Sequence, residues 1–180
     1  MNKSACILFI VLSFSFLSFS QDKDERKFFV NTTALEIFVN NESGYSNESS
    51  HINKGFGFEL STFNGFFLFK KLSLSIGAGI SINVNEYFNS LPMVGDLKWY
   101  LYDYGINSPY ILLNAGKNLN IGSFKGGYSS KLGIGYSFES DFKFQYIIEV
   151  FIKSKEFLIN KETNFNYQTT SLGVSLGIKL

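Results

Sequence analysis

Residues 72–85 read LSLSIGAGISINVN, and this strict alternation constrains the fold more than any other stretch of the chain. One set of alternating positions is apolar, and the other set holds only serine, glycine and asparagine. A period of two indicates a β-strand, because a helix would spread both sets around its circumference. A soluble sheet usually turns charged residues to water, whereas this second face is small and neutral. The pattern is typical of a strand that crosses a bilayer, which takes about 10 residues.

The composition agrees with a sheet in a membrane. The 180-residue chain is 45% hydrophobic and 18% aromatic but only 17% charged, against about 25% charged in an ordinary soluble domain. No run of about 18 apolar residues lies outside the N-terminus, which excludes helical membrane spans. A sheet in lipid must close on itself, because only closure satisfies every backbone polar group. The sequence therefore predicts an all-β transmembrane barrel.

The N-terminus matches a secretory signal peptide. Lys3 supplies the positive start, residues 5–19 form an apolar run, and the small residue Ser20 ends a suitable cleavage site. We therefore expect two segments, a signal peptide at residues 1–20 and an outer-membrane β-barrel domain at residues 21–180.

Cleavage at this position would also fix the chemistry of the mature chain. It removes Cys6, the only cysteine, so no disulfide and no cysteine metal ligand would remain. It also removes Lys3 and leaves equal numbers of basic and acidic residues. A chain without net charge has no general attraction to nucleic acid.

The remainder of the chain repeats the alternation and predicts eight antiparallel strands in an up-and-down barrel. The predicted strands cover residues 27–39, 55–69, 72–85, 92–102, 109–117, 127–138, 142–153 and 167–180. Within the second strand, Asn64-Gly65 is a competing hairpin signal. A turn there would leave a strand too short to cross a bilayer. We expect instead a bulge or kink at Gly65 and the turn at Lys70-Lys71.

Two regularities support this reading. The connections after odd-numbered strands, above all residues 40–54 and 154–166, are predicted to be longer than the others, as in outer-membrane barrels with periplasmic termini. The outer faces of strands three to eight are expected to carry no charge, since a lysine or arginine at mid-bilayer costs about 2–4 kcal/mol. The charged residues assigned to the inner face are Glu36, Glu59, Asp96, Lys98, Lys131, Lys143, Glu149 and Lys153.

A polar network is predicted in the lumen. Asp96 and Lys98 lie two apart on one inner face, and Glu59, Lys131 and Glu149 are expected nearby. Such a group is either a selectivity or ligand site, or a set of internal salt bridges that fills the lumen. We favour the second interpretation, because eight strands leave an interior just wide enough for side chains.

Aromatic residues gather at the predicted periplasmic strand ends, where an interfacial girdle explains them without a binding role. The girdle residues are Trp99, Tyr100, Tyr102 and Tyr136. His51, the only histidine, lies in the first external loop. Nucleophilic catalysis needs a base, an orienting carboxylate and a nucleophile in contact, which a Ser/Asn-rich loop does not supply by itself. We expect no enzymatic activity, no cofactor and no metal site.

Several short segments carry a resemblance to a known family. They are Asn64-Gly65-Phe66-Phe67, residues 72–79, Leu91-Pro92, residues 96–100, Ser108-Pro109, Gly126-Gly127-Tyr128, Leu132-Gly133 and a signal that ends in Ser-Gln. With them the mature chain resembles the porin-family or OmpX-like small outer-membrane barrels of Bacteroidetes. The resemblance implies an eight-stranded meander in the outer membrane of a Gram-negative cell envelope, without an agreed activity. The terminal Leu180 departs from the aromatic residue that often ends such barrels.

These observations predict a structural or surface-interaction scaffold that acts through its external loops. We expect a monomer that contacts outer-membrane lipid, reaches the barrel assembly machinery through its C-terminal strand, and offers its loops to an extracellular partner. Three alternatives stay open: a narrow porin-like channel for small solutes, a lipid-modifying enzyme that uses His51, and a soluble lipocalin-like barrel. The sequence names no ligand.

Overall fold

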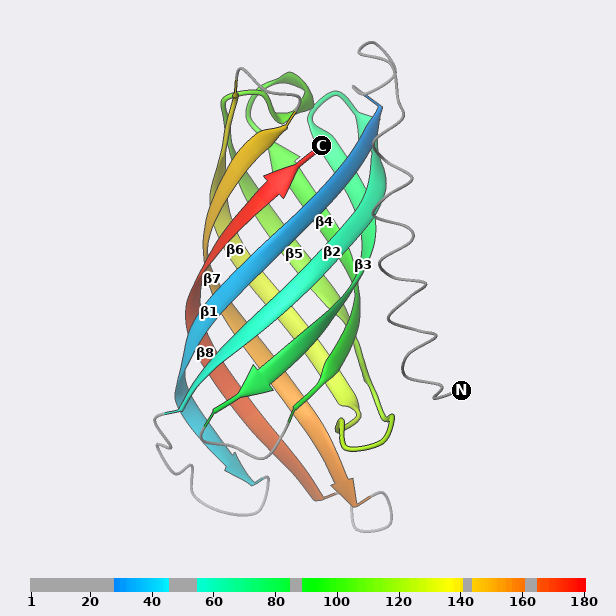
Figure 1. Cartoon of the computed structure of the whole chain (residues 1–180), viewed down its shortest axis with the longest axis vertical. Helices are drawn as coiled ribbons and strands as arrows, with labels where there is room; N and C mark the ends of the chain where they lie inside the picture. The colour runs from blue at the N-terminus through cyan, green and yellow to red at the C-terminus, as the bar shows by residue number, and fades with distance from the viewer. Residues whose placement is uncertain (1–27, 46–54, 85–88, 141–143, 161–164) are drawn as a thin grey trace.

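The computed structural model describes residues 28–45, 55–84, 89–140, 144–160 and 165–180. They form a closed antiparallel barrel in which each strand pairs with the next and the last pairs with the first (Figure 1). The described strands are β1 (Phe29–Tyr45), β2 (Phe56–Phe69), β3 (Leu72–Asn83), β4 (Leu91–Tyr100), β5 (Ser108–Leu119), β6 (Gly127–Phe138), β7 (Gln145–Asn160) and β8 (Phe165–Lys179). The predicted eight-stranded antiparallel barrel is therefore confirmed.

The strands are neighbours in the barrel in the same order as in the sequence. A 3-10 turn, η3 (Asp103–Gly105), lies between β4 and β5. The start of β1 and the end of β8 lie at one end of the barrel, together with the connections after β2, β4 and β6 (Figure 1). No helix among the described residues is long and apolar enough to cross a membrane. The predicted signal peptide lies outside the described residues.

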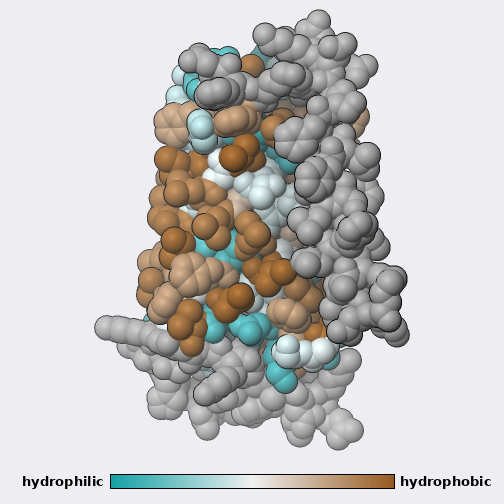
Figure 2. Space-filling view, in the orientation of Figure 1, coloured by the Kyte–Doolittle hydropathy of each residue, from teal (hydrophilic) through white to brown (hydrophobic). Residues whose placement is uncertain are grey.

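The barrel wall has an apolar outside and a polar inside. Leu74, Ile76 and Ile82 of β3 are exposed on the outer wall, whereas Ser73 and Ser75 are buried in the lumen. The front of the molecule, over β1, β2 and β8, shows the apolar surface directly (Figure 2). Hydrophobic side chains normally gather inside a soluble protein. Here the alternation turns most of the hydrophobic side chains outward, and the charged side chains on the opposite face of each strand point into the lumen.

Three strands are longer than the sequence suggested. Residues 40–45, assigned to a loop, continue β1, and most of residues 154–166 belong to β7 and β8. The alternation persists there with a different polarity: Lys155 and Phe157 point inward while Ser154 points outward. A search for apolar outer faces misses such segments, because their outward residues are polar.

The longer strands also change the connections. The β7–β8 connection shrinks to residues 161–164, while the β4–β5 connection covers residues 101–107. The expected contrast between long and short connections is therefore weaker than predicted. One outer-face assignment was also wrong: Lys117 is exposed on the outer side of β5, where its ammonium lies 5.7 Å from the ring centre of Tyr128.

The expected irregularity in β2 lies at a different position. Gly65 pairs in register with residues of both neighbouring strands, so it forms no bulge. The shift in pairing with β3 falls between Phe67 and Phe69, just before the turn at residues 70–71. A Cβ on Gly65 would collide with the backbone of Ser75. Gly65 therefore allows a close approach of two strands rather than a turn.

Large rings pack against glycines on the inner wall. A Cβ on Gly77 would collide with the ring of Phe63, and a Cβ on Gly173 would lie 2.5 Å from the ring of Phe151. Phe63 and Phe151 are themselves almost fully buried. Glycine at these positions makes room for a ring that crosses the narrow lumen. The small face of β3 is therefore required by packing.

We predict that Gly77→Ala destabilises the barrel by about 1–3 kcal/mol, since the ring of Phe63 must move in a filled core. Gly95→Ala is the matched control, because its Cβ would meet only one carbonyl oxygen at 3.8 Å. That control should be neutral or slightly stabilising. Denaturant unfolding in detergent, followed by gel mobility of the folded form, measures both. Equal stability of the two variants would contradict the packing argument.

Candidate functional site

The most distinctive feature of the lumen is a continuous chain of buried ion pairs. Eight side chains of alternating sign take part, each at most 6% exposed. In order of contact they are Asp96, Lys98, Glu149, Lys131, Glu36, Lys153, Glu59 and Lys155. Four carboxylates and four ammonium groups meet, so the chain carries no net charge. The structure thus brings together all five residues that the sequence assigned to the lumen network.

The two shortest ion pairs are those of Glu36, at the centre of this chain. Lys131 donates to Glu36 at 2.7 Å and to Glu149 at 3.1 Å. Lys98 reaches the other oxygen of Glu149 at 3.0 Å. Lys153 bonds the second oxygen of Glu36. The bonds of Glu36 to Lys131 and Lys153 join β1 to β6 and β7, which lie far apart in sequence.

The outer members of the chain extend it in both directions. Asp96 contacts Lys98 at 3.9 Å, the longest of these pairs. Toward the end of the barrel that carries the β1–β2 connection, Lys155 donates to Glu59 at 2.9 Å and to the hydroxyl of Ser81 at 2.6 Å. Buried charges are tolerated only when they are paired and hydrogen-bonded. This chain meets that condition at nearly every member.

Aromatic faces complete the surroundings of the lysines. The ammonium of Lys131 lies 5.0 Å from the ring centre of Phe151. The ammonium of Lys155 lies 5.1 Å from the ring centre of Phe38, and that of Lys153 lies 5.5 Å from the same ring. Desolvated cations gain electrostatic energy from such rings. The lumen is therefore packed with rings and ion pairs.

An aromatic cluster closes the end of the lumen near the barrel termini. Tyr100, Tyr110 and Phe67 pack together, with ring centres 5.0 Å apart for the two tyrosines and 5.6 Å apart for Phe67 and Tyr100. Tyr100 is fully buried. Its assignment to the interfacial girdle was therefore wrong, because its place in the alternation of β4 turns it into the lumen.

The turn after β4 folds over this cluster and is held by the last strand. Lys179 of β8 donates to the backbone carbonyls of Tyr104 and Gly105, both at 3.1 Å. Tyr104 and Gly105 have positive φ angles of 56° and 66°. The left-handed conformation costs energy for a tyrosine, so surrounding contacts must maintain it. Lys179 lies outside the ion-pair chain and was not part of the predicted network.

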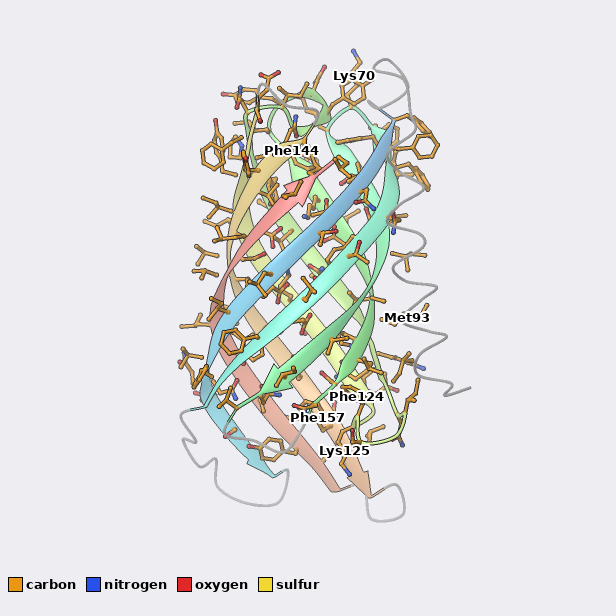
Figure 3. The ribbon with its side chains drawn as sticks, in the orientation of Figure 1. Lys70, Met93, Phe124, Lys125, Phe144 and Phe157 are labelled. Atoms are coloured by element: carbon orange, nitrogen blue, oxygen red, sulfur yellow. The ribbon has the colours of Figure 1, made fainter. Side chains whose placement is uncertain are left out.

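The remaining girdle residues lie on the outer wall. Trp99 is 66% exposed and Tyr102 is 54% exposed. Tyr136 is also exposed on the outer face, and its hydroxyl donates to the carbonyl of Asn107 at 3.1 Å. Met93 likewise points away from the barrel (Figure 3). These placements match an outer belt, in contrast to Tyr100.

Two predicted residues cannot be placed. His51 and Lys143 lie outside the described residues. Within the described ranges, no group of three or more His, Cys, Asp or Glu side chains is arranged to hold a metal ion. The one network member that sequence reasoning missed entirely is Lys155, because residues 154–166 were assigned to a loop. The period of two continues past residue 153 and places Lys155 and Phe157 on the inner face. This continued period is the signal that could have found Lys155.

Comparisons with known proteins concern the fold. No protein-family model matches the chain, and no curated protein matches it. The crystal structure of Neisserial surface protein A (NspA) is similar, with 16% identity, 83% of this chain and 96% of that chain covered, and a TM-score of 0.45. The outer membrane protein AlkL, solved in DMPC bilayers, has 11% identity, coverage of 85% and 90%, and a TM-score of 0.41. A designed transmembrane β-barrel has 12% identity, coverage of 80% and 94%, and a TM-score of 0.36.

We predict that Glu36→Gln destabilises the barrel by about 3–5 kcal/mol, because it leaves a net positive charge in a buried chain. Adding Lys153→Met should recover more than half of this loss, since every remaining charge then keeps a partner of opposite sign. Asp103→Asn is the control. It removes the exposed pair between Asp103 and Lys70 at 3.7 Å, which is worth at most about 1 kcal/mol. Thermal unfolding in detergent measures all three. A double variant no more stable than Glu36→Gln would contradict the charge-balance argument.

Proposed function

We propose that the chain is a small integral protein of the bacterial outer membrane that acts as a non-conducting structural and surface-interaction scaffold. The observation that carries this proposal is the sorting of charge: among the described residues nine charged side chains are buried inside the barrel, while the outer wall is mostly apolar. In water the opposite arrangement would be favoured. A soluble lipocalin-like barrel is therefore the poorer interpretation.

The outer wall also has a sharp boundary at the end of the barrel that carries the β1–β2 connection. Val39, Leu172 and Ile152 form one register row across β1, β8 and β7, and all three are exposed. Beyond them the outward residues become polar, as with Ser154 and Thr170, which pair with each other. An abrupt change of this kind fits the edge of the hydrocarbon layer.

Beyond this boundary β7, β8 and β1 continue as one sheet, and β6 stays paired to β7 as far as Gly127, opposite Phe157. Pairing between β1 and β8 extends to Tyr45 and Tyr167, whereas β2 begins opposite Val39 (Figure 1). We infer that this sheet projects on the external side and presents the neighbouring connections to an extracellular partner. In this proposal the chain is a monomer of the Bacteroidetes-type, OmpX-like kind, assembled through its C-terminal strand.

The filled lumen is the reason for a scaffold rather than a channel. The ion-pair chain crosses the interior, and the cluster of Tyr100, Tyr110 and Phe67 closes one end. Passage of a solute would require several buried pairs to separate at once, each at a cost of several kcal/mol. No feature of the described residues favours catalysis, so the proposal assigns no enzymatic activity.

Membrane insertion and a closed lumen each predict a measurable property of the purified protein. The protein should require detergent for extraction, run with heat-modifiable gel mobility, and show no steady conductance in planar bilayers. The Lys131→Ala and Glu149→Ala double variant should show brief openings, because it removes the centre of the ion-pair chain. A steady open conductance of the unaltered protein would contradict the scaffold proposal and favour the porin-like alternative.

The non-enzymatic part is tested separately at His51. Cells that carry His51→Ala should have the same lipid A profile by mass spectrometry as cells with the unaltered protein. Deletion of the whole gene serves as the reference for any indirect effect of losing the barrel. A lipid A change common to His51→Ala and the deletion would support the lipid-modifying alternative.

A further inference from the structure

A groove lies on the outer wall of the barrel. Its volume is about 660 Å³, and it crosses β4, β5, β6 and β7. One side is a register row of exposed apolar side chains, formed by Trp99, Ile111, Ile134 and Val150. These neighbours pair one after another across four strands, so the row spans three strand spacings, roughly 14 Å.

A second row forms the other side of the groove. Pro109, Tyr136 and Ile148 pair across β5, β6 and β7, two residues along each strand from the first row. Tyr136 packs against Phe138 with ring centres 4.6 Å apart, and its hydroxyl is fixed by the carbonyl of Asn107. Gly135 lies between the two rows and contributes no side chain to the floor. The groove is therefore lined almost wholly by apolar side chains.

The border of the groove carries the carboxylate of Glu139, which forms no ion pair with any residue that the structure describes. Asn107 donates its side-chain amide to the carboxylate of Glu139 at 3.2 Å and accepts the backbone N–H of Glu139 at 2.7 Å. The nearby acid Asp103 is balanced by Lys70 at 3.7 Å. A negative charge next to an apolar groove favours a lipid whose headgroup carries an ammonium group.

We propose that this groove binds a phospholipid with an ammonium headgroup, of the phosphatidylethanolamine class. One acyl chain lies between the two rows, and the ammonium lies against Glu139. The site rests on the proposed function, because an acyl chain reaches the groove only if the outer wall faces a bilayer. It adds a defined lipid partner to the general contact of the wall with membrane lipid.

Trp99 provides the measurement, because it is the only tryptophan in the chain and lies in the first row. The full chain is reconstituted in phosphatidylglycerol vesicles that contain a few mole per cent of a lipid brominated in its acyl chains. Brominated phosphatidylethanolamine should quench Trp99 fluorescence at least threefold more than brominated phosphatidylglycerol at the same mole fraction. Equal quenching by the two lipids would mean random contact only and would overturn the site.

Three variants separate the parts of the site. Ile134→Phe fills the groove and should abolish the preference, whereas Ile37→Phe, on the outer face of β1 on the opposite wall, should leave it unchanged. Glu139→Gln should lower the preference between headgroups while quenching persists. A preference that survives Ile134→Phe overturns the proposed groove. If no brominated lipid quenches Trp99 even at high mole fraction, the outer wall is not in lipid, and the proposed membrane function itself fails.

Discussion

The neutralisation of charge inside the lumen is the interaction on which the rest of the structure depends. The four carboxylates and four lysines of the ion-pair chain lie in a narrow interior, and burial of any one without its partner would cost several kcal/mol. Glu36 and Glu149 hold central positions because each accepts from two lysines. The chain joins β1, β2, β4, β6 and β7, so strand pairing around the wall is reinforced by bonds across it.

Small residues and large rings make this chain sterically possible. Glycines on the inner wall receive the rings of Phe63 and Phe151, and the ring of Phe151 also lies against the ammonium groups of Lys131 and Lys153. The serines of β3 occupy little volume beside the ion pairs. A lumen of eight strands has room for one layer of large side chains, so small residues must alternate with large ones around the wall.

The same arrangement links the inside of the barrel to its surroundings. The charged side chains of the ion-pair chain point into the lumen, and the apolar side chains of the opposite strand faces cover the outer wall. On β4 to β7 two rows of these apolar side chains form the groove beside Glu139. Beyond Val39 and Ile152 the outer wall becomes polar while the inner wall stays packed. One barrel thus presents a closed interior, an apolar belt and a projecting sheet, each with different physical demands.

The sequence by itself determined the strand count, the barrel and the inward set of Glu59, Asp96, Lys98, Lys131 and Glu149, because a period of two assigns each side chain to a face. It could not determine the ends of β1, β7 and β8, where the outward residues are polar and the apolar signal disappears. For the same reason it missed Lys155. Only the tertiary structure decided which charges pair and formed the groove, since these depend on register and curvature between strands distant in sequence.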